Sequence, residues 1–226
     1  MARRVSELLS YLGIVSLCIC LLVSLAQIKI SYLKSNVNYI NYFNLSLIQF
    51  VSCLLSFLIL IYIFITSDFN FSLVYQNSHT EKPMIYKLSG SWGNHEGSLL
   101  MWILILTIFN FVFALMSKVN IRLTEITVGV QSFLILGFLL FLLFTSNPFS
   151  LLSESPNEGL GLNPILQDPF LAIHPPILYL GYVGFSLIFS LAIAGLLLNL
   201  IDKNWASIAK KWTLSDWVLL TAGIGL

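Results

Sequence analysis

The stretch Asn163-Pro-Ile-Leu-Gln-Asp-Pro-Phe-Leu-Ala-Ile-His-Pro-Pro-Ile-Leu-Tyr-Leu-Gly-Tyr182 places one histidine, His174, between a polar, proline-rich segment and a long apolar run. The residue before a proline is disfavoured in the helical region, so we expect His174 to be extended. Pro175 and Pro176 suit the first positions of a helix, where no backbone donor is missed. The sequence therefore predicts an imidazole at the mouth of a membrane helix, where it can bind a ligand outside the bilayer.

The composition of the chain is typical of a polytopic membrane protein. Of its 226 residues, 58% are hydrophobic and only 9% are charged, whereas soluble domains have about 25% charged residues. The net charge of +1 and the lack of a basic patch argue against a nucleic-acid partner. Cys18, Cys20 and Cys53 lie in apolar runs without C-x-x-C spacing, so we expect buried thiols rather than a disulfide framework.

Apolar runs of the length that crosses a bilayer, about 20 residues, predict an all-α bundle in a single membrane domain over 1–226. The expected spans are 8–26, 45–66, 98–116, 124–145, 176–200 and 212–226. From 212 the chain would reach only ~22 Å at the helical rise, short of the ~30 Å hydrocarbon core. The last span is therefore expected to be incomplete, in a split gene or a fragment.

The first apolar run has two interpretations. Arg3 and Arg4 precede it, and Ser24-Leu25-Ala26 resembles a signal-peptidase site, so a cleaved signal peptide is one alternative. Because similar spans follow, we favour a retained first helix of the bundle.

The distribution of positive charge predicts the orientation in the membrane. The more basic loops, after spans one, three and five, hold Lys29, Lys34, Lys118, Arg122, Lys203, Lys210 and Lys211, while the opposite side holds Arg3, Arg4, Lys82 and Lys87. The positive-inside rule then places the N-terminus and the long loops 67–97 and 146–175 outside. The membrane is expected to be the mitochondrial inner or the bacterial cytoplasmic membrane.

A second unusual motif, Lys87-Leu-Ser-Gly-Ser-Trp-Gly-Asn-His-Glu-Gly-Ser98, leads directly into the third span. We expect Asn94 to cap the helix, with the Glu96 carboxylate in the first turn. Trp92 is expected to lie at the level of the lipid headgroups. Two interpretations stay open: a capped helix entry, or a docking surface shaped by the glycines Gly90, Gly93 and Gly97.

The histidines of the two motifs are expected on the same face of the membrane. His95 precedes the third span and His174 the fifth, so each follows an even number of crossings. His95 is too near Glu96 in sequence for that spacing to indicate a catalytic pair. The third histidine, His79, lies in a polar loop and is expected to be solvated.

The polar residues within the spans favour structural roles. Gln49, Asn110 and Gln131 are uncharged and are expected to join helices through hydrogen bonds. Glu125 and Asp216 are expected near span ends. Without a charged midplane, a transporter is the least favoured class.

Both motifs resemble those of the CcmF-type cytochrome c maturation proteins, the haem lyase component of cytochrome c assembly. The resemblance rests on the Lys87–Ser98 motif, on the segment from Leu162-Asn-Pro through His-Pro-Pro to Phe185, and on Trp212-Thr-Leu-Ser-Asp-Trp217, and it extends from about residue 80 onward. It implies that haem b, acting as transient substrate and cofactor, arrives on the outer face from a haem chaperone and is joined to apocytochrome c. It also implies that His174 is an axial ligand to the haem iron; no residue is assigned a catalytic role.

The resemblance also supplies a set of accessory residues and a missing partner. The residues expected to form a docking or structural motif are Trp92, Gly93, Asn94, His95, Glu96, Gly97, Asp168, Pro175, Pro176 and Tyr179. Proteins of this type continue into a tryptophan-rich external segment, which we expect a second polypeptide to provide. The chain would then be inactive alone. Two alternatives stay open: a haem-handling or export protein that feeds the chaperone, and a non-catalytic scaffold subunit of the assembly complex.

Overall fold

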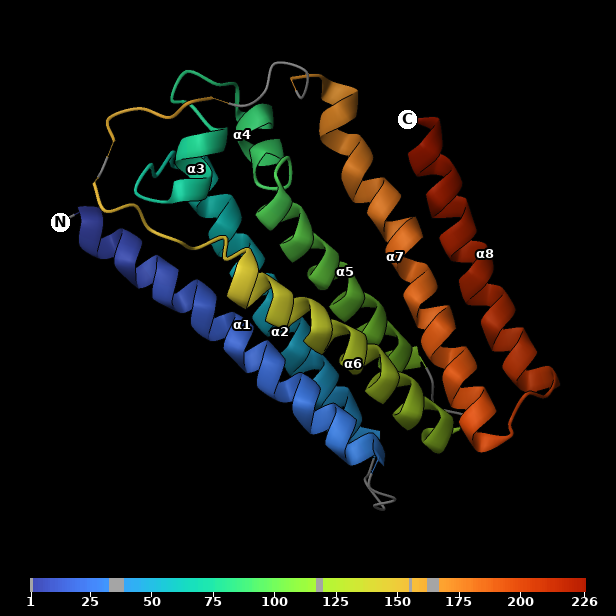
Figure 1. The fold of residues 1–226 in the computed structure, drawn as a ribbon. Helices are drawn as coiled ribbons and strands as arrows, with labels where there is room; N and C mark the ends of the chain where they lie inside the picture. The colour runs from blue at the N-terminus through green and yellow to red at the C-terminus, as the bar shows by residue number, and fades with distance from the viewer. Residues whose placement is uncertain (1, 33–38, 117–119, 155, 162–166) are drawn as a thin grey trace.

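The computed structural model describes residues 2–32, 39–116, 120–154, 156–161 and 167–226. Over these residues the chain is all-helical, as predicted, with a single isolated antiparallel bridge between Phe71 and Leu151. The helices are α1 (Ala2–Tyr32), α2 (Tyr39–Ile65), α3 (Ser72–Asn77), α4 (Met84–Gly90), α5 (His95–Met116), α6 (Ile121–Thr145), α7 (Pro169–Leu198) and α8 (Lys203–Gly225). Figure 1 shows the long helices side by side, with the short α3 and α4 at one end.

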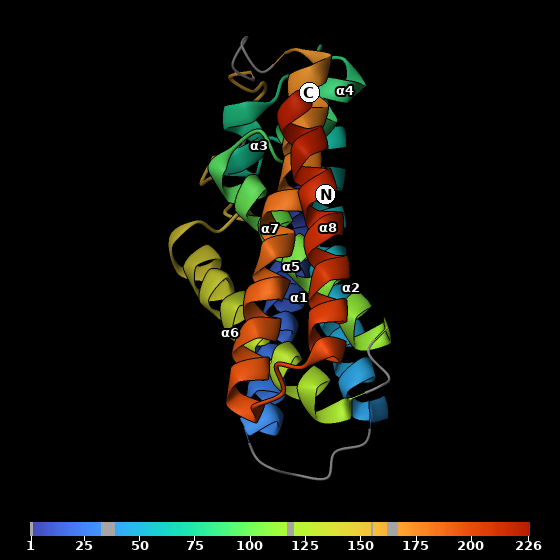
Figure 2. The ribbon, with the colours of Figure 1, turned by 90° about the vertical axis from the view of Figure 1, so that its right-hand side faces the viewer.

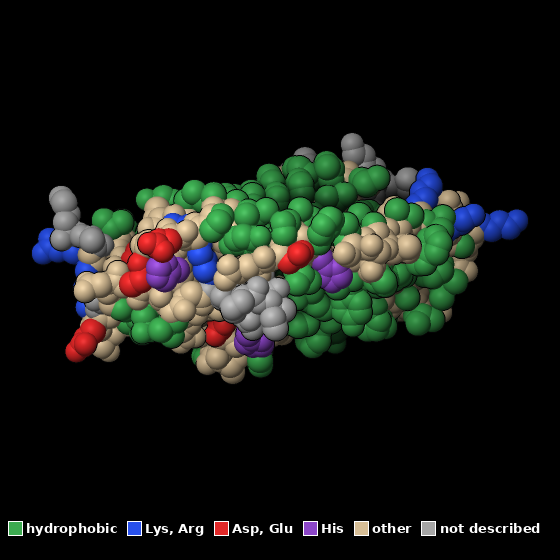
Figure 3. All heavy atoms as spheres, turned by 90° about the horizontal axis from the view of Figure 1, so that it is seen from above, with side chains coloured by type: hydrophobic (Ala, Val, Ile, Leu, Met, Phe, Trp, Pro, Cys, Tyr) green, Lys and Arg blue, Asp and Glu red, His purple; other side chains and the backbone are tan. Residues whose placement is uncertain are grey.

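Five of the described helices, α1, α2, α5, α6 and α7, are long and apolar enough to cross a membrane. Figure 3 shows hydrophobic side chains over much of the surface and Lys and Arg side chains mainly toward its two ends. Residues 212–225 of the predicted sixth span are also helical, but the helix that contains them begins earlier. Asp202 accepts a hydrogen bond from the backbone nitrogen of Trp205 at 2.7 Å and caps α8, which therefore begins at Lys203 and not at 212.

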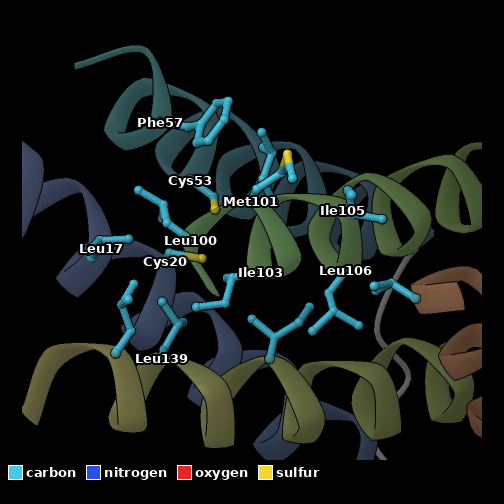
Figure 4. Packing of buried hydrophobic residues seen from close by; sticks show 14 of the residues in the cluster. Leu17, Cys20, Cys53, Phe57, Leu100, Met101, Ile103, Ile105, Leu106 and Leu139 are labelled. Carbon is cyan, nitrogen blue, oxygen red and sulfur yellow. The ribbon is translucent and has the colours of Figure 1, made fainter. Parts of the chain in front are cut away.

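The core of the bundle lies between α1, α2, α5 and α6. Figure 4 shows Leu17, Cys53, Leu100, Ile103 and Leu139 pointing into it, and all five are fully buried. Two of the cysteines behave as the predicted small hydrophobes, because Cys20 and Cys53 are buried as free thiols. The prediction failed for Cys18, which is exposed on the surface of α1.

Buried amides connect the helices, as the sequence predicted. The amide of Gln49 donates to Ser24 Oγ at 2.8 Å, and that of Asn110 donates to Gln49 Oε1 at 2.7 Å, so α1, α2 and α5 are joined in series. Gln131 donates to Ser186 Oγ at 2.8 Å, which ties α6 to α7. Such bonds each contribute about 0.6 kcal/mol on average inside a membrane.

The two long loops lie at the same end of the bundle and are bound to each other and to α1. The nitrogen of Leu152 donates to the carbonyl of Asn70 at 2.8 Å, and Arg3 donates to the carbonyl of Ser153 at 2.9 Å. The Phe149 ring is 1% exposed and covers Gly13, where a Cβ would lie 2.6 Å from the ring. The N-terminal end of α1 is therefore fixed beside the loops that carry the predicted site.

Candidate functional site

The helix that carries His174 begins earlier than predicted. The carboxylate of Asp168 accepts hydrogen bonds from the nitrogens of Phe170 at 2.8 Å and Leu171 at 3.2 Å, and Pro169 occupies the first helical position. Asp-Pro therefore provides the cap and the first residue of α7. The expectation of an extended His174 at the helix mouth is wrong, because His174 lies inside α7. The N-cap outweighs the bias that a proline imposes on the residue before it.

Pro175 and Pro176 consequently lie inside α7 rather than at its start. A proline has no backbone donor, so these two leave the carbonyls of Leu171 and Ala172 without their helical partners. The indole Nε1 of Trp92 donates to the Ala172 carbonyl at 2.9 Å. This bond joins the Lys87–Ser98 motif to the His-Pro-Pro motif. The position of Trp92 at the level of the lipid headgroups stays a prediction.

The surroundings of His174 are apolar and open. Its side chain is half-buried. Its neighbours Phe170, Leu171 and Ile173 expose 65%, 42% and 50% of their surfaces. The backbone that carries this exposed face is held by the Asp168 cap before it and by the Trp92 bond to Ala172. A half-buried imidazole beside exposed apolar side chains can bind a planar apolar ligand that has a metal at its centre.

The start of α5 has the predicted cap. The Asn94 side chain accepts from the Gly97 nitrogen at 2.7 Å and donates to the Gly90 carbonyl at 2.6 Å. A Cβ on Gly97 would lie 1.7 Å from the Ser91 carbonyl oxygen, so only glycine fits at this position. Gly93 continues the same turn by donating to the Ser89 carbonyl at 2.7 Å. The glycine-rich segment is thus a compact helix entry that fixes Trp92.

His95 and Glu96 occupy the first turn of α5. The Nε2 of His95 lies 3.1 Å from Ser146 Oγ, and its ring meets the Phe141 ring edge-on at 6.2 Å. These contacts are with α6 and the residue that follows it, whereas Trp92 contacts α7. The Trp-Gly-Asn-His-Glu-Gly motif therefore links α5 to two neighbouring helices.

Tyr179 belongs to an aromatic cluster between α5 and α7. Its ring packs edge-on against Trp102 with 5.4 Å between centroids, and Tyr182 makes a similar contact at 5.4 Å. Phe138 of α6 completes the group at 5.8 Å from Trp102. Tyr179 thus supports the helix that carries His174.

A carboxylate on the second loop holds the two loops together. Glu158 accepts from the side chain and the backbone nitrogen of Thr80 and from the Gly159 nitrogen, and the His79 ring lies 3.9 Å away. These hydrogen bonds, chiefly that of the Thr80 hydroxyl, lower the pKa of Glu158 to about 2. His79 is partly exposed, as predicted, but it contributes to this contact.

The two acidic residues of the later helices differ in position. Glu125 lies in the first turns of α6, as expected, and pairs with Arg122 and Tyr42. Asp216 is fully buried in the middle of α8, and its expected place near a span end stays a prediction. Neither of its carboxylate oxygens has a hydrogen-bond partner among the described residues. Over the same residues no group of three or more His, Cys, Asp or Glu is arranged to hold a metal ion.

Comparison with known proteins identifies the family to which these motifs belong. Residues 92–226, which begin at Trp92, match the model of a family described as cytochrome C assembly protein. The chain belongs to this family. The matched region contains Trp92, the Asp168 cap and His174.

Relatives in this family are longer than the chain. The cytochrome c-type biogenesis protein ccl1 of Rhodobacter capsulatus is 50% identical over 182 residues, covering 80% of this chain and 28% of the relative. CcmF of Escherichia coli is 45% identical over 179 residues, covering 78% and 28%. A solved structure, cytochrome c heme lyase CcmF, superposes with a TM-score of 0.82 at 24% identity, over 95% of this chain and 35% of that one. The chain therefore has that fold and spans about 28% of the length of these two relatives.

Proposed function

We propose that the chain is the N-terminal membrane part of a haem lyase in cytochrome c maturation, and that His174 is an axial ligand to the iron of its substrate, haem. The observation that carries the proposal is the doubly fixed start of α7. Asp168 caps the helix on one side of His174, and Trp92 binds the Ala172 carbonyl two residues before it. The names of the relatives, cytochrome c-type biogenesis protein and CcmF, support the same process.

The residues around His174 suit haem. Imidazole is a common axial ligand of haem iron. The exposed side chains of Phe170, Leu171 and Ile173 would lose their contact with water against a porphyrin face, a change worth about 25 cal/mol for each Å² of apolar surface that is buried. Phe170 and Leu171 lie four and three residues before His174, on the same face of α7, so one bound macrocycle would contact both.

The chain would contribute position rather than acid–base chemistry. In the reaction that joins haem to apocytochrome c, each cysteine thiol adds across a vinyl group. A C–S bond forms, and the thiol proton ends on the second vinyl carbon, so the addition is redox-neutral. Holding the haem at a fixed ligand brings the vinyl groups to the thiols and supplies the advantage of proximity.

We further propose that residues outside 1–226 complete the haem site, because His174 supplies a single iron ligand. A second axial ligand and a tryptophan-rich surface would come from a companion polypeptide or from further chain. A haem chaperone would deliver the haem on the outer face. The purified chain is then expected to bind haem weakly, and tight bis-histidine haem in the isolated chain would contradict this.

The test of the proposal is His174→Ala, with His79→Ala as a matched control on the same end of the bundle. Loss of covalent c-type cytochrome, measured by haem staining, is expected for His174→Ala alone. Normal maturation by this variant would overturn the proposal and favour a scaffold. Haem-loaded chaperone should accumulate in the variant if the chain acts in the lyase step, and should disappear if the chain instead supplies the chaperone.

A further inference from the structure

A cavity of about 440 Å³ lies at the end of the bundle opposite the long loops. Figure 2 shows the end of α5 and the start of α6 beside the first turns of α8, and the cavity lies among these segments. Its apolar wall includes Phe113 and Met116 of α5 and Ile208 and Trp212 of α8. The volume falls in the range of small-molecule sites, roughly 300–1,000 Å³.

One side of the cavity is polar and positively charged. Among the described residues of its lining, Lys211 is the one charged residue, and Asn120, Thr124 and Ser215 are polar. Asn120 caps α6 by accepting from the Leu123 nitrogen at 3.0 Å, so the positive end of the α6 dipole meets the cavity here. The polar side therefore favours an anion.

The ligand that fits an apolar wall, a cationic edge and a membrane setting is an amphiphile with an anionic head. Lys210 directly precedes Lys211, and Lys203 lies at the start of the same helix; both are exposed, so they add positive potential at this end of the bundle. Anionic phospholipids are attracted to clusters of basic residues near the membrane surface.

We propose that this cavity binds one acyl chain of an anionic phospholipid, whose phosphate contacts Lys211 and the N-terminus of α6. The apolar wall accommodates the chain, and Lys211 selects the headgroup. The site lies on segments other than those that carry His174, so it is independent of the proposed haem-lyase function.

The test uses the full chain in nanodiscs that contain phosphatidylglycerol with a photoactivatable diazirine in one acyl chain. Mass spectrometry of the cross-linked peptides should find label on Met116, Ile208 and Trp212. The phosphatidylcholine analogue with the same tail should label them less. Lys211→Ala should reduce labelling by phosphatidylglycerol about five-fold, the effect of one basic residue near the surface.

Lys210→Ala is the matched control, because it removes the same charge from the adjacent residue, which does not line the cavity. Lys210 adds to the local positive potential but does not line the cavity, so its loss should reduce the labelling at these positions clearly less than Lys211→Ala does. Equal labelling by the two lipids, equal effects of the two lysine substitutions, or label confined to the exposed face at Trp217 and Val218 would each overturn the proposal. If inorganic phosphate binds at Lys211 without reducing the acyl-chain label, Lys211 belongs to a site for a free anion. This outcome would also overturn the proposal.

Discussion

The indole nitrogen of Trp92 donates a hydrogen bond, 2.9 Å long, to the carbonyl oxygen of Ala172, which Pro176 leaves without a helical donor. The bond crosses from the segment before α5 to the second turn of α7. It holds the backbone next to His174 from outside the helix, so Trp92 of the Lys87–Ser98 motif positions His174, the proposed iron ligand.

Trp92→Phe should loosen the start of α7. The substitution keeps an aromatic ring but removes the donor, so the Ala172 carbonyl is left unpaired at a cost of roughly 1–3 kcal/mol. Thermal unfolding in detergent should show the loss, and hydrogen exchange should accelerate over 170–174. The matched control is Trp205→Phe, which removes a similar bond from Trp205 to the Leu191 carbonyl at 3.1 Å. The Leu191 carbonyl lies inside α7 and keeps its helical donor, so that control should lower stability less and leave cytochrome c maturation intact. Equal loss of maturation in both variants would contradict a positioning role for Trp92.

Asp168→Ala should fray the first turn of α7. Loss of an N-cap costs about 0.5–2 kcal/mol, whereas asparagine caps nearly as well as aspartate. Hydrogen exchange at Phe170 and Leu171 should therefore increase in Asp168→Ala and stay close to the parent in Asp168→Asn. If hydrogen exchange increases as much in Asp168→Asn as in Asp168→Ala, the carboxylate acts through its charge and not as a cap.

Gly97→Ala should disrupt the entry to α5. The added methyl would lie 1.7 Å from the Ser91 carbonyl oxygen, so the backbone must move. Gly137→Ala is the control, because the same change in α6 meets no atom within 4 Å and should stabilise that helix by roughly 0.5–1 kcal/mol. The melting temperature should fall for the first variant and be unchanged or higher for the second. An unchanged melting temperature for Gly97→Ala would contradict the close approach of residue 97 to the Ser91 carbonyl.

The contact between the loops should weaken at acidic pH. Because the pKa of Glu158 is lowered to about 2 on folding, the contact is strongest above the ordinary glutamate value of ~4.3. It is lost as the pH falls from there through about 2. Exchange of the Thr80 and Gly159 amides, corrected for intrinsic rates, should increase over this interval. Glu158→Gln should remove the pH dependence, and a variant that retains it would assign the transition to another group.

The sequence predicted the bundle well because apolar runs long enough to cross a bilayer have few other structures available to them. It failed at the starts of α7 and α8, where Asp168 and Asp202 begin the helices before the apolar runs do. Both positions carry an ordinary capping signal, so these starts were predictable. The Asp168-Pro169 pair begins α7, and the prolines at 175 and 176 are accommodated inside it.

The link between Trp92 and Ala172 could be predicted only in part. Span parity placed the two motifs on one face, and a proline within a helix indicates that a carbonyl needs another donor. Choosing Trp92 as that donor requires the packing of α4 and α5 against α7, which no local pattern contains. The burial of Asp216 depends on packing in the same way, because Gly184 of α7 leaves the space that its carboxylate fills.

The most direct test of the central claim, that His174 binds haem iron, is rescue of His174→Gly by free imidazole. Covalent haem on a c-type cytochrome would be measured in cells that express the variant with and without added imidazole. The proposed role predicts loss of maturation in the variant and recovery with imidazole, because the free base can occupy the space of the missing ring and bind the iron. Maturation at the parent level without imidazole, or a loss that imidazole does not reverse while the variant folds normally, would contradict it.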